Sequence, residues 1–330
     1  MDLHLFCIAT LPPTRSDLLR KTLKKYPTLV ALYRWLRRRT SLSGLGNKWE
    51  KSADASTLAK AVLDVERCRE ILSDPLNLLV DRVPQSGFVE EGKNVILHNG
   101  IRVPLRGKFS YYGGFSEILV LNRGVHEPLE EYCFQELLKA LPPKSRPTML
   151  ELGAYWGHYS MWLKKVFPEA TVVLVEPDSR GLQAGKNNFA LNGMQGTFMN
   201  SFVSEESFTV DSYMATTDFG SLTVLHSDIQ GYELEMLRGA SLALSKSAVD
   251  YVFLSSHSGV LHKNCLSELD KWGYHVEVSS EPEEHSTSFD GFIMARSKFA
   301  PPVFRGFSPM GRVEIANASS TTLLEYLAEL

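Results

Sequence analysis

Apolar positions in the second half of the chain alternate between short continuous runs and helix-like stripes. The strand-length runs are 149–152, 171–176, 196–203, 222–228, 250–256, 274–279 and 290–296. The helical stripes between them are 157–167, 178–191, 232–238 and 260–272. Strand runs that alternate with helices predict an α/β fold with a doubly wound, mostly parallel sheet. The first strands are apolar throughout, as expected where helices cover both faces of a sheet.

The pattern before residue 146 is different and predicts a helical and β-hairpin region. Helical spacing indicates one helix on each side of Pro27. It indicates two further helices over 53–72 and 127–138. Residues 94–105 alternate around Asn99-Gly100, which predicts a hairpin with a type I′ turn. A short apolar run at 116–122 is interpreted as a strand.

These patterns divide the chain into four parts, and the last is expected to end in a short helix docked on the body. The expected parts are a basic helical region at 1–90, the hairpin and helix at 91–145, the main α/β domain at 146–300 and an extension at 301–330.

Composition narrows the class of protein. The 330 residues are 44% hydrophobic and 22% charged, which is typical of a soluble globular chain. No apolar run reaches the roughly 18 residues of a membrane span, and the first residues lack the basic start of a signal peptide. Four cysteines without CxxC spacing argue against a disulfide framework or a zinc site, so a cytoplasmic location is expected.

Charge is unevenly distributed along the chain. Residues 1–44 carry nine Lys or Arg and two Asp, a net +7, so the remainder carries −10 of the total −3. The basic stretch 15–39 is compatible with peripheral contact to an anionic membrane or a partner. It is also compatible with a packed helix pair whose charged face is solvated.

The first candidate for chemistry is the segment 151–160, which ends the first strand and opens a helix. Ligands of open α/β sheets bind at this edge. Gly153 would allow a tight turn and close approach to a ligand, and Gly157 would lie at the helix start. Glu151 is placed to reach the charged amino-acid end of a ligand.

The second strand ends in Glu176, where a carboxylate can accept hydrogen bonds from both hydroxyls of a ribose. Glu176 is alternatively a helix-dipole partner, and Asp178 is interpreted as the helix N-cap. Further residues expected around the cofactor are Ala154, Tyr155, Tyr159, Pro177, Ser201 and Phe202.

The fourth and fifth strands bring His226, Asp228, Glu233 and His257 to the same edge. These residue types offer a general base, contacts to an ammonium group, or oxygen and nitrogen ligands for a metal ion. His226 is also compatible with a structural buried histidine. Asp228 is the strongest candidate, because an ionisable group that ends an apolar strand must be paired or used.

Together the motifs ELGAYWGHYS, VEPD, KNNFALNG, HSDIQGYELEMLRGA and FDGFIMAR resemble the FkbM-type S-adenosylmethionine (SAM)-dependent methyltransferases over residues 110–297. The resemblance implies a class I, Rossmann-like seven-stranded sheet with a reversed final hairpin. It implies SAM as cofactor and methyl transfer to a hydroxyl of a small molecule or sugar. Two positions depart from the family pattern, Tyr155-Trp156 in the first loop and His226 in place of a lysine.

For this reaction we expect His257 or His226 to act as the base, with Asp228 holding the cofactor or a metal. A Mg²⁺ ion at Asp228, Glu233 and His257 is an open option, as is a homodimer. The alternatives are a non-catalytic scaffold with this fold and an RNA methyltransferase that uses the basic arm; the acidic body disfavours nucleic acid. A nicotinamide dehydrogenase is disfavoured because the loop lacks the middle glycine.

Overall fold

The computed structural model describes residues 55–111, 115–217, 220–288 and 290–330. The chain divides into two units, Met1–Glu66 and Arg67–Leu330. The basic segment 15–39, with its expected helices and membrane contact, lies outside the described residues.

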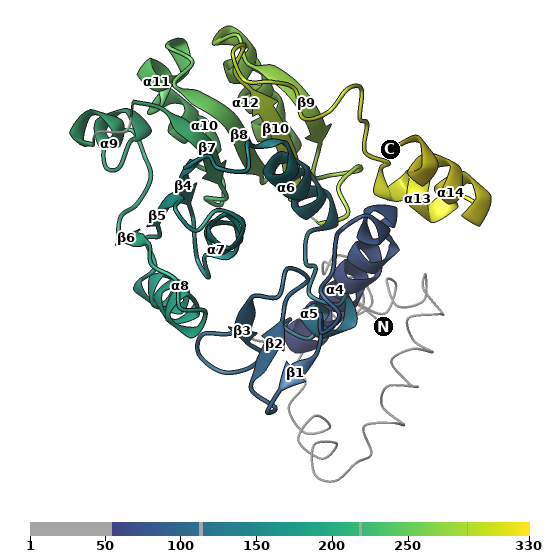
Figure 1. Ribbon diagram of the computed structural model, residues 1–330. Coiled ribbons are helices and arrows are strands. Elements are labelled where there is room, and N and C mark those ends of the chain that lie inside the picture. Colours follow the sequence, from purple (N-terminus) through teal and green to yellow (C-terminus); the bar gives the residue numbers. More distant parts are fainter. Residues whose placement is uncertain (1–54, 112–114, 218–219, 289) are drawn as a thin grey trace, which may run out of the picture. The chain divides into compact units, whose positions relative to one another are not determined.

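A seven-stranded sheet forms the centre of the second unit (Figure 1). Across the sheet the strands are β6 (Thr197–Met199), β5 (Thr171–Val175), β4 (Thr148–Leu152), β7 (Leu222–Ser227), β8 (Val249–Ser256), β10 (Gly291–Arg296) and β9 (His275–Ser280). Neighbours pair in parallel except β10, which is antiparallel to both β8 and β9. All seven expected strands are therefore confirmed, and so is the reversed final hairpin.

Helices cover both faces of the sheet, and alternate strand residues face opposite layers. In β8, Tyr251 and Phe253 belong to one hydrophobic cluster, whereas Val252 and Leu254 belong to the other. The first cluster includes side chains of α6 (Pro128–Ala140), α7 (His158–Val166) and α8 (Ser179–Leu191). The second includes side chains of α9 (Val210–Thr216), α10 (Glu233–Arg238), α11 (Ser241–Ser245) and α12 (Gly259–Lys271).

A small antiparallel sheet precedes α6 and shares its hydrophobic cluster. It contains β1 (Val89–Glu90), β2 (Asn94–Ile96) and β3 (Arg102–Pro104), which confirms the hairpin. The turn is not type I′, because only Gly100 has a positive φ, of +79°. The Asn99 side chain instead accepts a hydrogen bond from the Ile101 backbone N–H at 3.1 Å, an Asx turn that replaces the second left-handed residue.

The expected strand at 116–122 is wrong: the structure has a helical turn, α5 (Ile118–Leu121). A short apolar run cannot be assigned to strand or helix by periodicity alone. Here the adjacent residues Ile118 and Leu119 are both buried, which does not fit the alternation of a half-buried strand. Arg123 and Gly124 then adopt positive φ and end the turn.

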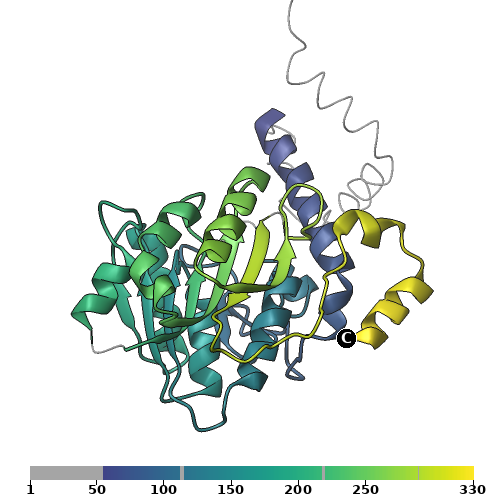
Figure 2. The same cartoon turned by 90° about the horizontal axis from the view of Figure 1, so that it is seen from above.

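The expected helices over 53–72 and 127–138 are confirmed as α4 (Ala55–Ser73) and α6. A short 3₁₀ turn, η1 (Pro75–Leu78), follows α4. The C-terminal segment, yellow in Figure 2, ends in α13 (Arg312–Asn317) and α14 (Ser320–Glu329). Helix α14 contacts η1 and places Tyr326 against the first hydrophobic cluster, so the expected docking is observed. None of the helices in the described part of the chain is long and apolar enough to cross a membrane.

Candidate functional site

A cavity of about 210 Å³ opens at the carboxyl ends of β4, β5, β7 and β8. Its walls are Tyr111, His126, Glu127, Glu130, Glu151, Gly153, Ala154, Tyr155, Trp156, Tyr159, Glu176, His226, Asp228, Gln230 and Ser255. Residues expected from the first, second and fourth strands therefore meet at one place. They meet because parallel strands deliver their carboxyl ends to one edge of the sheet.

The turn after β4 has no room for a side chain at Gly153. Its φ is +70°, and a Cβ atom there would lie 1.7 Å from the carbonyl oxygen of Asp228. The turn is held by the Gly153 N–H, which donates to the Val175 carbonyl at 2.9 Å. This close approach of two strand ends brings Asp228 next to the first loop.

Two larger residues of the cavity wall also adopt left-handed backbone, Tyr155 with φ +40° and Gln230 with φ +55°. Such conformations cost energy for residues other than glycine and concentrate at functional sites. Both are held by neighbours: the Tyr155 N–H donates to Glu176 at 3.0 Å, and Gln230 Nε2 donates to Asp228 at 3.0 Å. The two carboxylates thus fix the shape of the wall.

Glu151 and Glu176 are both buried. Glu176 accepts the N–H of Tyr155 on one oxygen and that of Asp178 on the other, and Asp178 itself caps α8 as expected. Glu151 accepts the N–H of Ser160 at 3.1 Å. Burial raises the pKa of both carboxyls above the ordinary value.

His226 is held by a carboxylate from outside the sheet. Glu130 of α6 lies with Oε1 2.6 Å from His226 Nε2, and its Oε2 accepts the hydroxyl of Ser255 at 3.2 Å. Burial alone would lower the pKa of His226, but the charge and hydrogen bond of Glu130, together with the charges of Glu151 and Asp228, raise it above the ordinary value. The other ring nitrogen, Nδ1, is buried without a hydrogen-bond partner among the described residues.

His257 contacts Asp228 but is not itself part of the cavity wall. Its Nε2 is 3.2 Å from Asp228 and its Nδ1 is 3.0 Å from Glu233. Burial would lower the pKa of His257, but these two carboxylates raise it to about 10. Burial would raise the pKa of Asp228, but the hydrogen bond from His257 lowers it. Asp228 and Glu233 contact opposite nitrogens of His257, so the three residues do not direct their ligand atoms at one point, as a Mg²⁺ ion there would require.

Several expected cofactor residues lie outside the cavity wall. Pro177 and Phe202 are exposed, and Phe202 makes an edge contact with Tyr232. Ser201 and Gly157 do not line the cavity, but Gly157 lies at the start of α7 as expected, with φ +73°.

Sequence reasoning missed the contribution of α6. Glu127 and Glu130 enter the cavity wall, and burial raises the pKa of Glu127 to about 8. A signal was present: Glu130 and Glu131 precede Phe134 by four and three positions and continue its apolar stripe, so two carboxylates occupy a buried helix face.

A family model described as "Methyltransferase small domain" matches residues 133–213, about a quarter of the chain. No curated protein matches the chain.

Among solved structures, the ribosomal protein L11 methylase of Lactobacillus delbrueckii subsp. bulgaricus is 14% identical with a TM-score of 0.37, over 52% of this chain and 81% of that one. The precorrin-6y C5,15-methyltransferase of Geobacter metallireducens GS-15 is 13% identical with a TM-score of 0.37, over 50% and 87%. A SAM-dependent O-methyltransferase of Thermotoga maritima is 12% identical with a TM-score of 0.37, over 51% and 66%.

The order of the seven strands, with β10 reversed, together with the family-model match gives the class I, Rossmann-like fold of methyltransferases.

Proposed function

We propose that this chain is a SAM-dependent methyltransferase that methylates a hydroxyl group of a small molecule or sugar. The observation that carries the proposal is the convergence of Glu151, Gly153, Glu176 and Asp228 on one cavity at the carboxyl edge of this sheet. The family-model match supports the reaction class. The choice of acceptor rests on the charges and bases of the cavity.

The acidic residues of the cavity wall fit SAM as the cofactor. Five acidic side chains form part of the wall: Glu127, which with a pKa of about 8 is mostly protonated at neutral pH, and Glu130, Glu151, Glu176 and Asp228. SAM carries a positive sulfonium and an ammonium group, which acidic walls attract. Each oxygen of Glu176 already accepts one backbone N–H and keeps a second lone pair for a ribose hydroxyl. Bound SAM would supply an activated methyl group, so the protein mainly has to align the acceptor.

The same charges favour a neutral or cationic acceptor over nucleic acid. A phosphate backbone is bound by basic surfaces, and no Lys or Arg lines the cavity among the described residues. A hydroxyl acceptor must lose its proton as the new bond forms, which calls for a base in the wall.

His226 is the base that this geometry supports. Glu130 holds its Nε2 and leaves Nδ1 free to take a proton, the arrangement of an oriented histidine in acid–base catalysis. His257 suits the role poorly, because a pKa of about 10 keeps its ring protonated at neutral pH. We therefore propose that His257 positions Asp228, which in turn contacts the cofactor.

Calorimetric titration with S-adenosylhomocysteine tests the cofactor assignment. Wild-type protein is expected to bind in the micromolar range, and Glu176→Ala is expected to lose binding. Glu169→Ala, at an exposed glutamate, is the matched control and should bind as the wild type does. Absence of binding by folded wild-type protein would contradict the proposal. Labelled SAM offered to hydroxylated small molecules and to RNA then distinguishes the acceptors.

A further inference from the structure

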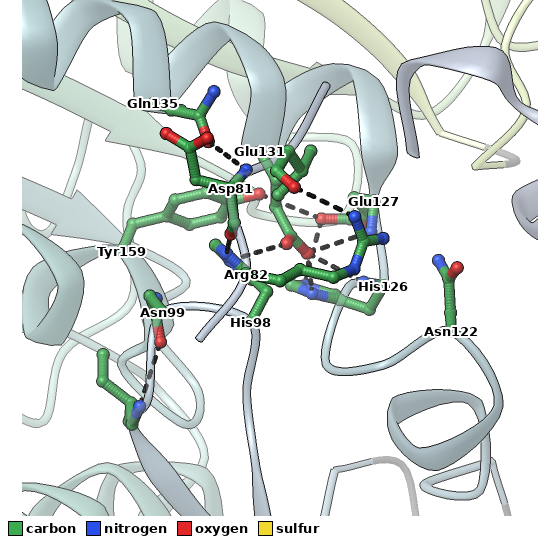
Figure 3. Close-up of polar contacts among 12 residues, drawn as sticks. Asp81, Arg82, His98, Asn99, Asn122, His126, Glu127, Glu131, Gln135 and Tyr159 are labelled. Carbon is green, nitrogen blue, oxygen red and sulfur yellow. Dashed lines mark hydrogen bonds and ion pairs between the residues drawn. The ribbon is translucent and has the colours of Figure 1, made fainter. Parts of the chain in front are cut away.

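A second cluster of histidine and carboxylate groups lies outside the cavity wall. His98 comes from the β2–β3 turn, Glu131 from α6 and His158 from the first position of α7. All three are buried, with at most 1% exposure. One ligand atom from each lies within 4.8 Å of the other two. Figure 3 shows His98 and His126 pointing toward the Glu131 carboxylate.

The burial of the His158 imidazole is not explained by hydrogen bonds to the described residues. Neither of its ring nitrogens has a hydrogen-bond partner among the described residues, although the ring is buried. A buried polar group without a partner is costly, and a neutral imidazole is the form that binds metals.

The other two residues are oriented as metal ligands are. His98 Nδ1 faces the Asp81 carbonyl at 3.3 Å, which leaves Nε2 directed at Glu131 Oε2, 2.9 Å away. The opposite oxygen of Glu131 accepts the backbone N–H of His126 at 2.8 Å and pairs with its ring. A histidine fixed through its second nitrogen by a carbonyl is a recurrent feature of metal sites.

We propose that His98, Glu131 and His158 bind a divalent transition-metal ion with the coordination preference of Zn²⁺. Two imidazole nitrogens and one carboxylate oxygen are a ligand set of Zn²⁺ and related ions, whereas Mg²⁺ prefers oxygen ligands. The ion would fill the gap that leaves the His158 nitrogens unpaired. Another cavity, of about 550 Å³, borders His98 and offers a route for an ion.

The role of the ion would be to link the β2–β3 hairpin to α6 and α7, two helices that pack on the main sheet. Helix α6 carries Glu130 into the cavity wall one residue before Glu131, and α7 begins directly after the loop of Gly153. A metal at this junction would therefore stabilise both elements. The inference does not depend on methyl transfer, because its tests measure metal and stability alone.

The experiment uses full-length protein freed of metal with a chelator and titrated with Zn²⁺ alone. We expect one tightly bound ion per chain by calorimetry and a melting temperature raised by several degrees, since a ligand of the native state stabilises it. Co²⁺ in place of Zn²⁺ should give visible absorption of a nitrogen–oxygen site without the intense thiolate band of a cysteine site.

His158→Phe is the decisive variant, because it keeps a ring against Trp156, on which His158 stacks with centroids 5.1 Å apart, and removes both nitrogens. It should melt near the metal-free wild type and show no shift with Zn²⁺. His275→Ala, at an exposed histidine, should keep the full shift. If His158→Phe does not fold, His98→Gln carries the same expectation. Wild-type protein without saturable Zn²⁺ binding, or equal binding by the folded variant, would overturn the proposal.

Discussion

Glu130 Oε1 lies 2.6 Å from His226 Nε2, and this contact joins helix α6 to strand β7 at the cavity wall. The two residues are 96 positions apart in the sequence. In water-poor surroundings the Glu130 carboxylate favours the protonated imidazole and raises the pKa of His226. The contact therefore determines both the orientation of the ring and the pH range in which it can act as a base.

The first prediction concerns this pair. A base must be deprotonated to act, so kcat of the wild type should rise as pH rises through the pKa of His226. Glu130→Gln removes the charge that raises this pKa, so the rise should move to lower pH. His226→Ala should lower kcat by about 10²–10⁴-fold, the usual contribution of a general base. Steady-state kinetics against pH measure both effects.

The affinity for S-adenosylhomocysteine provides the control for that experiment. It should change little in His226→Ala, because Glu176 and the first loop, not His226, are assigned to the cofactor. A pH profile of Glu130→Gln that coincides with the wild type would remove His226 from the proposed role.

Gly153 gives a second prediction, on stability. Gly153→Ala places a Cβ 1.7 Å from the Asp228 carbonyl oxygen and should lower the free energy of unfolding by more than about 3 kcal/mol. Gly193→Ala is the matched control, since Gly193 has a similar φ of +66° but no atom within 4 Å of the position that a Cβ would take. It should cost roughly 1–2 kcal/mol, the penalty of left-handed backbone. Urea unfolding measures both, and equal losses would contradict the steric argument.

Much of the fold can be predicted because its signals are local. Seven apolar runs with helices between them are enough to predict the strands. They also predict the edge of the sheet at which Gly153, Glu176 and Asp228 meet. The run at 116–122 is mistaken for a strand because its four consecutive apolar residues, Ile118 to Leu121, satisfy either periodicity. Nothing in the local sequence of His226 indicates Glu130 as its partner.

The contacts between distant segments could not be predicted for the same reason: they are not encoded locally. The pairing of α6 with β7, and of the hairpin turn with α7, depends on how layers pack, which no short motif encodes. His98, Glu131 and His158 therefore look like isolated residues in the sequence. The buried carboxylates of α6 are the one local hint, because charges on an apolar helix face require partners.

A third prediction tests the packing beneath the cavity. Phe134 of α6 is fully buried and contacts the rings of Tyr159, Trp162 and Phe253, so it links α6 to α7 and β8. Phe134→Ala should cost about 3–5 kcal/mol of unfolding free energy through the cavity it creates. Phe299→Ala, at a residue 74% exposed, should cost less than about 0.5 kcal/mol. Chemical denaturation compares the two, and similar losses would contradict the packing described here.

The last prediction is a pH dependence of stability at His257. Its pKa is raised from the usual 6.5 to about 10 by Asp228 and Glu233, so the folded state binds its proton more tightly than the unfolded state. This stabilisation is complete below about pH 6.5 and is lost as pH rises through 10. His257→Gln should therefore be less stable than the wild type by roughly 3 kcal/mol at about pH 6, with the difference shrinking toward pH 10. Unfolding by urea at about pH 6, 8 and 10 measures this difference, with His275→Gln at an exposed position as the control. A difference that stays constant over this range would show that the two carboxylates do not hold a charged His257, and the proposed positioning of Asp228 would fall with it.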